Sequence, residues 1–254
     1  MKKIYFILIF LTGFITLHAQ SAAIQGTKAE ADSAYIKNDF AAAVEMYESI
    51  LQNVGESADI YYNLGNSYYK MNNIAKAVLN YERALLLNPG NGDIRFNLEL
   101  ARSKTVDKVV SPSEMFFVTW TRSLINTMSE KGWAHTGITL FILTIVTLAL
   151  FIFGKRVILK KIGFISAICF FLMTILANVF ASEQKAELVN RGNAVIMAPS
   201  VTVKSTPNQS GTDLFILHEG RKVMIKDNTM KEWKEIKLED GNVGWVPAGV
   251  IEII

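Results

Sequence analysis

The sequence predicts a multidomain membrane protein that contains, in chain order, an all-α repeat solenoid, a two-helix transmembrane hairpin and a C-terminal all-β barrel. Three observations lead to this fold class. Residue types recur at an offset of 34 residues in the N-terminal part. Two apolar runs follow, each long enough to cross a bilayer. From Lys185 onward, short β-prone runs alternate with turn residues.

The composition of the 254-residue chain fits this architecture. Hydrophobic residues make up 50% and charged residues 19%, so part of the chain belongs in lipid. The positive charge gathers at Lys2, Lys3 and the link 154–161, while the two polar parts are slightly acidic. Neither part has the basic face that phosphate binding requires, so we expect no nucleic-acid partner.

The sequence lacks the usual signs of catalysis. Cys169 lies in an apolar run, and His18, His135 and His218 are too widely spaced to form a metal-binding motif. Nucleotide-binding loops and nucleophile motifs are missing as well. We therefore expect no catalytic residues, no metal, no cofactor and no enzyme activity.

The first element, residues 1–19, reads as a signal peptide. Lys2 and Lys3 form its basic start, Ile4 to Ile15 its apolar core, and Ala19 is a small residue suited to the cleavage site. The alternative is a signal anchor that is not cleaved. In both cases residues 20 to about 130 are exported.

The second element, residues 20–110, is a helical repeat domain. The recurring pairs are Tyr35 with Tyr69, Ala43 with Ala77, and Tyr47 with Tyr81. The unit Ala58 to Asn91 resembles the tetratricopeptide repeat, and the residues at the family's positions are Tyr61, Leu64, Gly65, Tyr68, Ala77, Tyr81, Ala84 and Pro89. A degenerate unit, about Ile24 to Ser57, precedes it, and Asp93 to Arg102 would form a capping or third-unit helix.

Such a stack has a concave face lined by the first helix of each unit. In the second unit that face would present Tyr62, Asn66, Tyr69 and Lys70. Planar rings beside hydrogen-bonding groups suit an extended peptide or a partner helix, so we interpret these residues as a partner-binding groove. The alternative is a solvated polar face with ordinary surface tyrosines.

Residues 111–133 form the next element, an interfacial or linker helix. Its apolar residues recur at i, i+4 spacing: Phe116, Trp120, Leu124 and Met128. This spacing is typical of a helix in the membrane interface, and equally of a linker helix packed on the soluble domain. Trp133 would anchor the entry to the first span.

Two transmembrane helices are expected, at 134–153 and 162–181. The link 154–161 carries four basic and no acidic residues, so the positive-inside rule places it in the cytoplasm. Both polar parts of the chain then lie outside. Gly163 and Ala167 form a small-xxx-small pair that would let the two spans pack closely.

The C-terminal element, residues 185–254, resembles a bacterial SH3 domain. The resemblance rests on Val201 to Pro207, Glu219-Gly220, Trp233 and Gly244-Trp245-Val246, while Lys204 and Thr206 depart from the family's Arg and Gly. The aromatic candidates for ligand contact are Phe215, Trp233 and Trp245. Trp245 has a second interpretation as part of the barrel core.

The order of these elements resembles the BatE proteins of the Bacteroides aerotolerance operon. This resemblance implies a bacterial inner-membrane scaffold with both soluble domains in the periplasm, which acts in tolerance of oxygen or another envelope stress. It also implies Bat partners with von Willebrand factor A domains and a MoxR-type ATPase. A different class of function stays open, a peptidoglycan-binding envelope protein that acts through its SH3-like domain.

Overall fold

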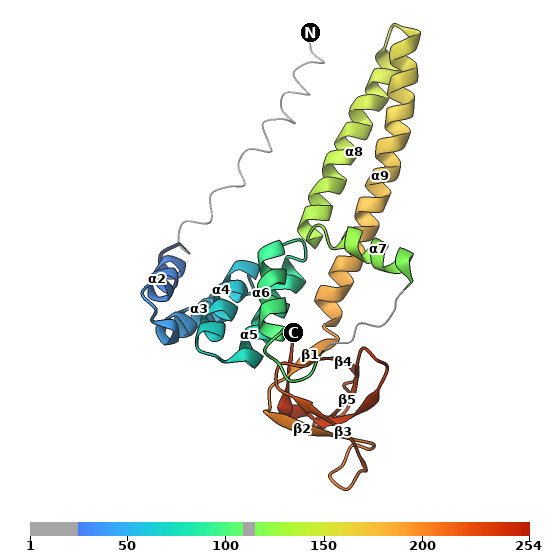
Figure 1. The fold of residues 1–254 in the computed structure, drawn as a ribbon. Coiled ribbons are helices and arrows are strands. Elements are labelled where there is room, and N and C mark those ends of the chain that lie inside the picture. Colours follow the sequence, from blue (N-terminus) through green and yellow to red (C-terminus); the bar gives the residue numbers. More distant parts are fainter. Residues whose placement is uncertain (1–24, 109–114) are drawn as a thin grey trace.

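The computed structural model describes residues 25–108 and 115–254, and Figure 1 shows their arrangement. A helical part and a β-sheet lie together at one end of a long two-helix hairpin. The predicted signal peptide, 1–19, and residues 111–114 of the predicted linker lie outside the described residues.

The helical part has five helices in succession: α2 (Gln25–Ile36), α3 (Phe40–Val54), α4 (Ala58–Lys70), α5 (Ile74–Leu87) and α6 (Gly92–Arg102). The turns α2–α3 and α4–α5 have one design, repeated at the 34-residue offset. Asn38 and Asn72 have left-handed φ values of 63° and 60°, which asparagine tolerates well. The next residues, Asp39 and Asn73, cap the following helix with their side chains. The sequence repeat is therefore also a structural repeat.

The two helices of the second unit pack closely at Gly65 of α4. A Cβ built on Gly65 would lie 2.7 Å from ring atoms Cδ1 and Cε1 of Tyr81, which is 1% exposed on α5. Ala31 occupies the equivalent position of the first unit and is fully buried. A small residue is needed at this position because the partner's aromatic ring fills the space above it.

The hairpin consists of α8 (Glu130–Phe153) and α9 (Val157–Asn190), which lie side by side (Figure 1). Both helices are long and apolar enough to cross a membrane. The predicted close packing at Gly163 is confirmed, because a Cβ there would lie 2.8 Å from the backbone of Phe151 and Thr147. Ala167 and Ala177 are buried in the same helix.

Both ends of α9 extend beyond the predicted span. The helix begins at Val157, so Lys160 and Lys161 belong to α9, and only Gly154 to Arg156 connect the two helices. Residues 157–162 include no glycine or proline that would stop a helix, which explains the shorter link. At the other end α9 continues past Ala181 to Asn190 and leads directly into the sheet.

The C-terminal part is a seven-stranded antiparallel sheet in the order β3-β2-β6-β5-β4-β1-β7. Its strands are β1 (Asn193–Ile196), β2 (Ser200–Lys204), β3 (Asp213–His218), β4 (Lys222–Asp227), β5 (Trp233–Lys237), β6 (Val243–Pro247) and β7 (Ile251–Ile253). Each strand lies within one or two residues of a β-prone run in the sequence. The sheet encloses its own apolar cluster, which includes Val203, Ile236 and Val246.

Strand β1 joins the sheet to the helices because both of its faces are buried. Ala194 and Ile196 face the sheet's own cluster. Val195, between them, belongs to the helical core, together with Ile254 at the C-terminus. Successive side chains of a strand point to opposite faces, so β1 is shared by two cores.

Ion pairs surround this shared strand, and the central one is at Glu82 of α5. Its side chain is 4% exposed and pairs with Arg102 of α6 and, at 2.8 Å, with Lys222 of β4. Burial alone would raise the pKa of Glu82, but Lys222 and Arg102 outweigh burial and hold the pKa below its ordinary value. Glu82 is therefore a carboxylate that connects the helices to the sheet.

Three further polar contacts join the parts. Arg83 donates to the Ile253 carbonyl at 2.6 Å and pairs with Glu252 of β7. The other two join Arg191 with Glu56, and His218 with Asp107. The helical part, the base of α9 and the sheet thus form one assembly.

Replacing Gly65 by Ala is expected to destabilise the protein by about 1–3 kcal/mol, because the new methyl group would overlap the Tyr81 ring. Thermal unfolding of the detergent-solubilised chain, followed by circular dichroism, measures this. Gly92→Ala is the matched control, since a Cβ at that position meets no atom within 4 Å. Equal melting temperatures for the two variants would contradict the packing argument.

Glu82→Gln is expected to cost about 3 kcal/mol at neutral pH, because two cations would lose their shared carboxylate. The pKa of Glu82 is lower in the folded chain than its ordinary value of 4.5, so its contribution is complete above that pH. Below pH 4.5 the unfolded chain takes up a proton at Glu82 before the folded chain does, so the difference in melting temperature between wild type and variant should shrink until the pH has passed the lower pKa of the folded chain.

Glu99→Gln provides the control for Glu82. Glu99 pairs with the same Arg102 at 2.7 Å, but its side chain is 62% exposed. Exposed ion pairs contribute little to the free energy of unfolding, so this variant should melt near the wild-type temperature. A Glu99 variant as unstable as the Glu82 variant would show that burial of the ion pair is unimportant.

Candidate functional site

The four predicted groove residues come together in the structure. Tyr62, Asn66, Tyr69 and Lys70 of α4 line one hollow of about 300 Å³. The remaining lining residues come from three other helices: Tyr35 of α2, Tyr81 of α5, and Asn97 and Leu100 of α6. The first helix of each unit thus contributes to one shared surface, which we call the groove.

Asn66 is the centre of the groove's hydrogen bonding. Its Oδ1 accepts from the Tyr81 hydroxyl at 2.8 Å and from Asn97 Nδ2 at 3.1 Å. Asn97 Nδ2 also donates to the Tyr62 hydroxyl at 2.8 Å. These bonds fix Tyr62 and Asn66 in place before any partner arrives, which lowers the entropy cost of binding.

The first unit has the same arrangement 34 residues earlier. There Asp32 Oδ1 accepts from the Tyr47 hydroxyl at 2.6 Å and from Asn63 Nδ2 at 3.2 Å. We call the two sets together the polar ladder: Asp32, Tyr47 and Asn63, then Asn66, Tyr81 and Asn97. Each set connects both helices of one unit to the first helix of the next, so α6 behaves as the start of a third unit.

Burial and hydrogen bonding together determine the protonation of the ladder. Burial raises the pKa of Tyr47, and its bond to Asp32 adds to this effect; burial likewise raises the pKa of Tyr81. For Asp32, burial would raise the pKa, but hydrogen bonds from Lys28 and Tyr47 lower it overall. At neutral pH the tyrosines are therefore donors and Asp32 is a charged acceptor.

The groove's rim is basic. Lys70 is exposed at one edge, and the Lys104 ammonium lies 4.2 Å from the centroid of the Tyr69 ring. None of the described residues that line the hollow is acidic. This surface favours a segment with acidic or neutral side chains.

The sequence analysis did not place in the groove four of its lining residues, Tyr35, Tyr81, Asn97 and Leu100, or the rim residue Lys104. Tyr35 is the equivalent of Tyr69, and Asn97 is the equivalent of Asn63. Lys104 corresponds in the same way to Lys70. Applying the offset to the four predicted residues would have identified Tyr35, Leu100 and Lys104, but not Asn97, because Asn63 was not a candidate.

The three aromatic candidates of the sheet are divided between its two faces. Phe215 packs against the internal cluster and is half-buried, a position that does not favour ligand contact, so its role stays a prediction. Trp233 and Trp245 alternate with the buried Ile236 and Val246 and therefore lie on the opposite face. Trp245 is half-buried there, so its alternative interpretation as core is not supported either.

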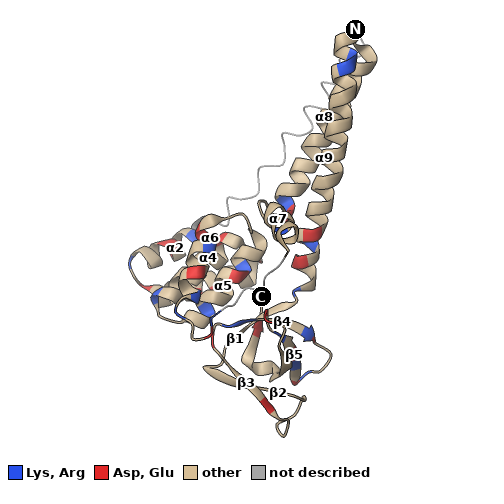
Figure 2. Cartoon of the chain, turned by 45° about the vertical axis from the view of Figure 1, so that its right-hand side comes forward, with Lys and Arg blue, Asp and Glu red and all other residues tan. Residues whose placement is uncertain are grey.

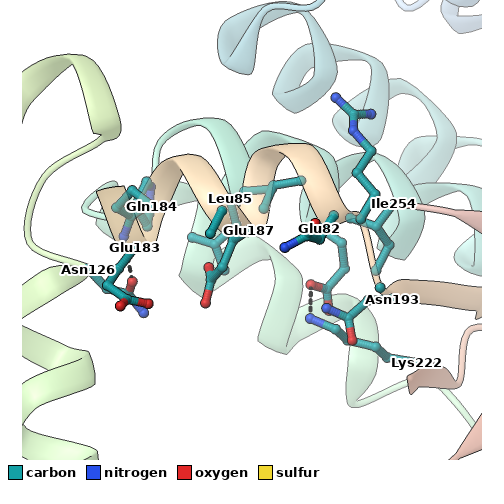
Figure 3. Close-up of a pocket in the computed structure, with 15 residues that line it drawn as sticks. Glu82, Leu85, Asn126, Glu183, Gln184, Glu187, Asn193, Lys222 and Ile254 are labelled. Carbon is teal, nitrogen blue, oxygen red and sulfur yellow. Dashed lines mark hydrogen bonds and ion pairs between the residues drawn. The ribbon is translucent and has the colours of Figure 1, made fainter. Parts of the chain in front are cut away.

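A larger hollow of about 420 Å³ lies between α5, the base of α9 and the sheet (Figure 3). Its central polar side chains have partners within the protein. Glu82 pairs with Lys222, and Gln184 Nε2 donates to Asn126 Oδ1 at 2.8 Å. We interpret it as the junction of the parts, while the groove is the candidate site.

Comparison with known proteins supports the repeat. Residues 58–91 match the sequence model of the tetratricopeptide repeat, which confirms the predicted second unit. None of the curated proteins compared with the chain matches it significantly. Tetratricopeptide repeats are protein-interaction modules, so the match indicates protein partners.

Proposed function

We propose that this protein is a non-enzymatic membrane scaffold whose groove binds an extended segment of a partner protein. The observation that carries this proposal is the groove itself. Tyr62, Asn66 and Tyr69 converge on one open hollow and are held there by the polar ladder. The sheet and the base of α9 cover other surfaces of the helical part, and the groove stays accessible.

The arrangement of charges supports a membrane orientation for the scaffold. The helical part and the sheet lie at one end of the hairpin, and the basic residues of 154–161 lie at the other (Figure 2). With the basic end in the cytoplasm, both soluble parts are periplasmic in a bacterial inner membrane.

The resemblance to the BatE proteins extends this proposal to a class of partner. The groove would hold a Bat protein with a von Willebrand factor A domain, in a complex that serves aerotolerance or envelope stress. The groove's basic rim suits an acidic segment of such a partner. Anchoring in the same membrane would raise the local concentration of both proteins and support binding to so small a groove.

Replacing Tyr62 and Asn66 by Ala is expected to abolish co-purification of partner proteins from native membranes. Loss of a central aromatic contact typically costs about 2 kcal/mol, which is roughly a 30-fold loss of affinity. The measurement is an affinity pull-down from detergent-solubilised membranes, with partners identified and quantified by mass spectrometry.

Two further variants separate binding from folding. Lys70→Glu reverses a charge on an exposed side chain that makes no ladder bond, so it should weaken recovery while the melting temperature is unchanged. Glu45→Ala changes an exposed residue of α3 away from the groove and should leave recovery intact. Full recovery with both groove variants would refute the proposed site.

A second function, cell-wall binding by the sheet, is favoured by one observation. Trp233 and Trp245 lie on the same outer face of adjacent strands, since Trp245 is paired with Glu235 and Trp233 with Pro247. Diagonal neighbours of this kind lie about 7–8 Å apart, close enough for two indoles to form one planar surface. Such a surface could hold peptidoglycan.

This second function predicts that the full chain sediments with purified peptidoglycan and that Trp233→Ala with Trp245→Ala releases it. The full chain is required, because Val195 and Ile254 of the C-terminal part are buried against the helices. Met224→Ala, an exposed residue of β4, is the control. If wild-type protein stays in the supernatant at low salt, the wall-binding function is excluded.

A further inference from the structure

The helix α7 (Phe116–Ile125) has an apolar side that no described part of the protein covers. None of its ten residues is buried. Phe116 is 83% exposed, Phe117 61% and Trp120 59%. At 3.6 residues per turn these side chains and Leu124 occupy about 100° of the helix surface. A stripe of this size on a water-exposed helix requires a partner.

The position of α7 indicates which partner covers it. Its C-terminal end is fixed to both helices of the hairpin: the Ile125 carbonyl accepts from Trp133 Nε1 at 2.8 Å and from Gln184 Nε2 at 3.3 Å. Trp133 also packs on Phe180, with ring centroids 5.0 Å apart. Phe180 and Ala181 end the apolar run of α9, and its polar end begins at Ser182 and Glu183, so α7 lies at the edge of the apolar band.

The direction of α7 also agrees with a position at the edge of the apolar band. In Figure 1 it runs across the foot of the hairpin and not along it, so its axis lies near the plane of a membrane crossed by α8 and α9. Indole rings are typical of the boundary between lipid and water, and Trp133 and Trp120 both lie at this height. The apolar side of α7 thus continues the apolar surface of the hairpin.

The opposite side of α7 is polar and basic. Thr119, Arg122 and Ser123 line a hollow of about 490 Å³ together with Arg95 of α6. None of the described residues that line it is acidic. Arginines beside an inserted apolar helix lie at the level of phospholipid phosphates.

We propose that α7 is a lipid-binding helix, which inserts Phe116, Phe117 and Trp120 between the headgroups of the bilayer leaflet on the side of the soluble parts. This inference rests on the membrane placement given under the proposed function. It adds a second attachment beside the hairpin. A Cβ on Gly90 would lie 2.3 Å from the Thr127 carbonyl, so the segment after α7 also packs on the repeat domain. Lipid contact at α7 therefore orients the groove relative to the membrane.

Site-directed spin labelling of the full chain in phosphatidylcholine–phosphatidylglycerol vesicles tests this inference. Cys169, which is free and exposed, is first replaced by Ser, and single cysteines are then introduced as Phe117→Cys and Thr119→Cys. These two positions point to nearly opposite sides of α7. The measured quantity is the relaxation of the nitroxide by collision with each reagent. Relaxation by oxygen indicates that the label lies in lipid, and relaxation by a water-soluble nickel chelate indicates that it lies in water.

The expected result is a label at 117 that is relaxed by oxygen and protected from nickel, and a label at 119 with the reverse behaviour. Equal access of nickel to both positions would overturn the inference, because α7 would then lie in water. Protection of 117 from both reagents would also overturn it, because protein would then cover the stripe.

A third label, Ile145→Cys in the middle of α8, separates this inference from the membrane placement. Ile145 is 52% exposed and faces outward from the hairpin. If 145 reports lipid while 117 does not, only the inference about α7 fails. If 145 itself reports water, the membrane placement in the proposed function fails, and the inference fails with it.

Discussion

The buried carboxylate of Glu82 is the interaction on which the arrangement of this protein depends. It lies where α5, α6 and β4 meet, and a lone charge there would carry a desolvation cost of several kcal/mol. Arg102 of α6 and Lys222 of β4 together offset that cost. The packing of α6 and the docking of the sheet are therefore coupled through Glu82. The fold is cooperative across parts that are far apart in the sequence.

The same coupling explains how so short a repeat array is stable. Two and a half units leave much of their apolar surface without a neighbouring repeat, and solenoids normally need at least three. Here Val195 and Ile254 of the C-terminal part complete the helical core. The polar ladder adds a fixed register between units, because each asparagine or aspartate acceptor is shared by donors from two helices. The sheet thus replaces the missing repeat.

What the sequence predicts follows from local pattern. The 34-residue offset predicts the repeat, hydropathy predicts the two long helices, and alternating β-prone runs predict the strands. The junction has no such signal, because Glu82 looks like an ordinary helix-surface charge and Lys222 is 140 residues away. The same holds for Phe215, because the run Leu214 to Leu217 is apolar at every position and only its pairing with Val203 shows which face it takes. Contacts between residues that are far apart in the sequence are set by tertiary packing, and a single sequence does not show that packing.

The extension of α9 gives this architecture a mechanical consequence. Residues 182–190 continue α9 beyond its apolar run for about 13 Å, at 1.5 Å per residue, and β1 follows two residues later. Arg191 then pairs with Glu56 at the junction of the two repeat units, and Arg83 holds β7. A continuous helix with ion pairs at its end transmits rotation, whereas a flexible linker would absorb it. The groove is therefore held at a fixed distance and angle relative to the hairpin. In the membrane placement that we propose, a partner anchored in the same bilayer would have to present its segment at that height.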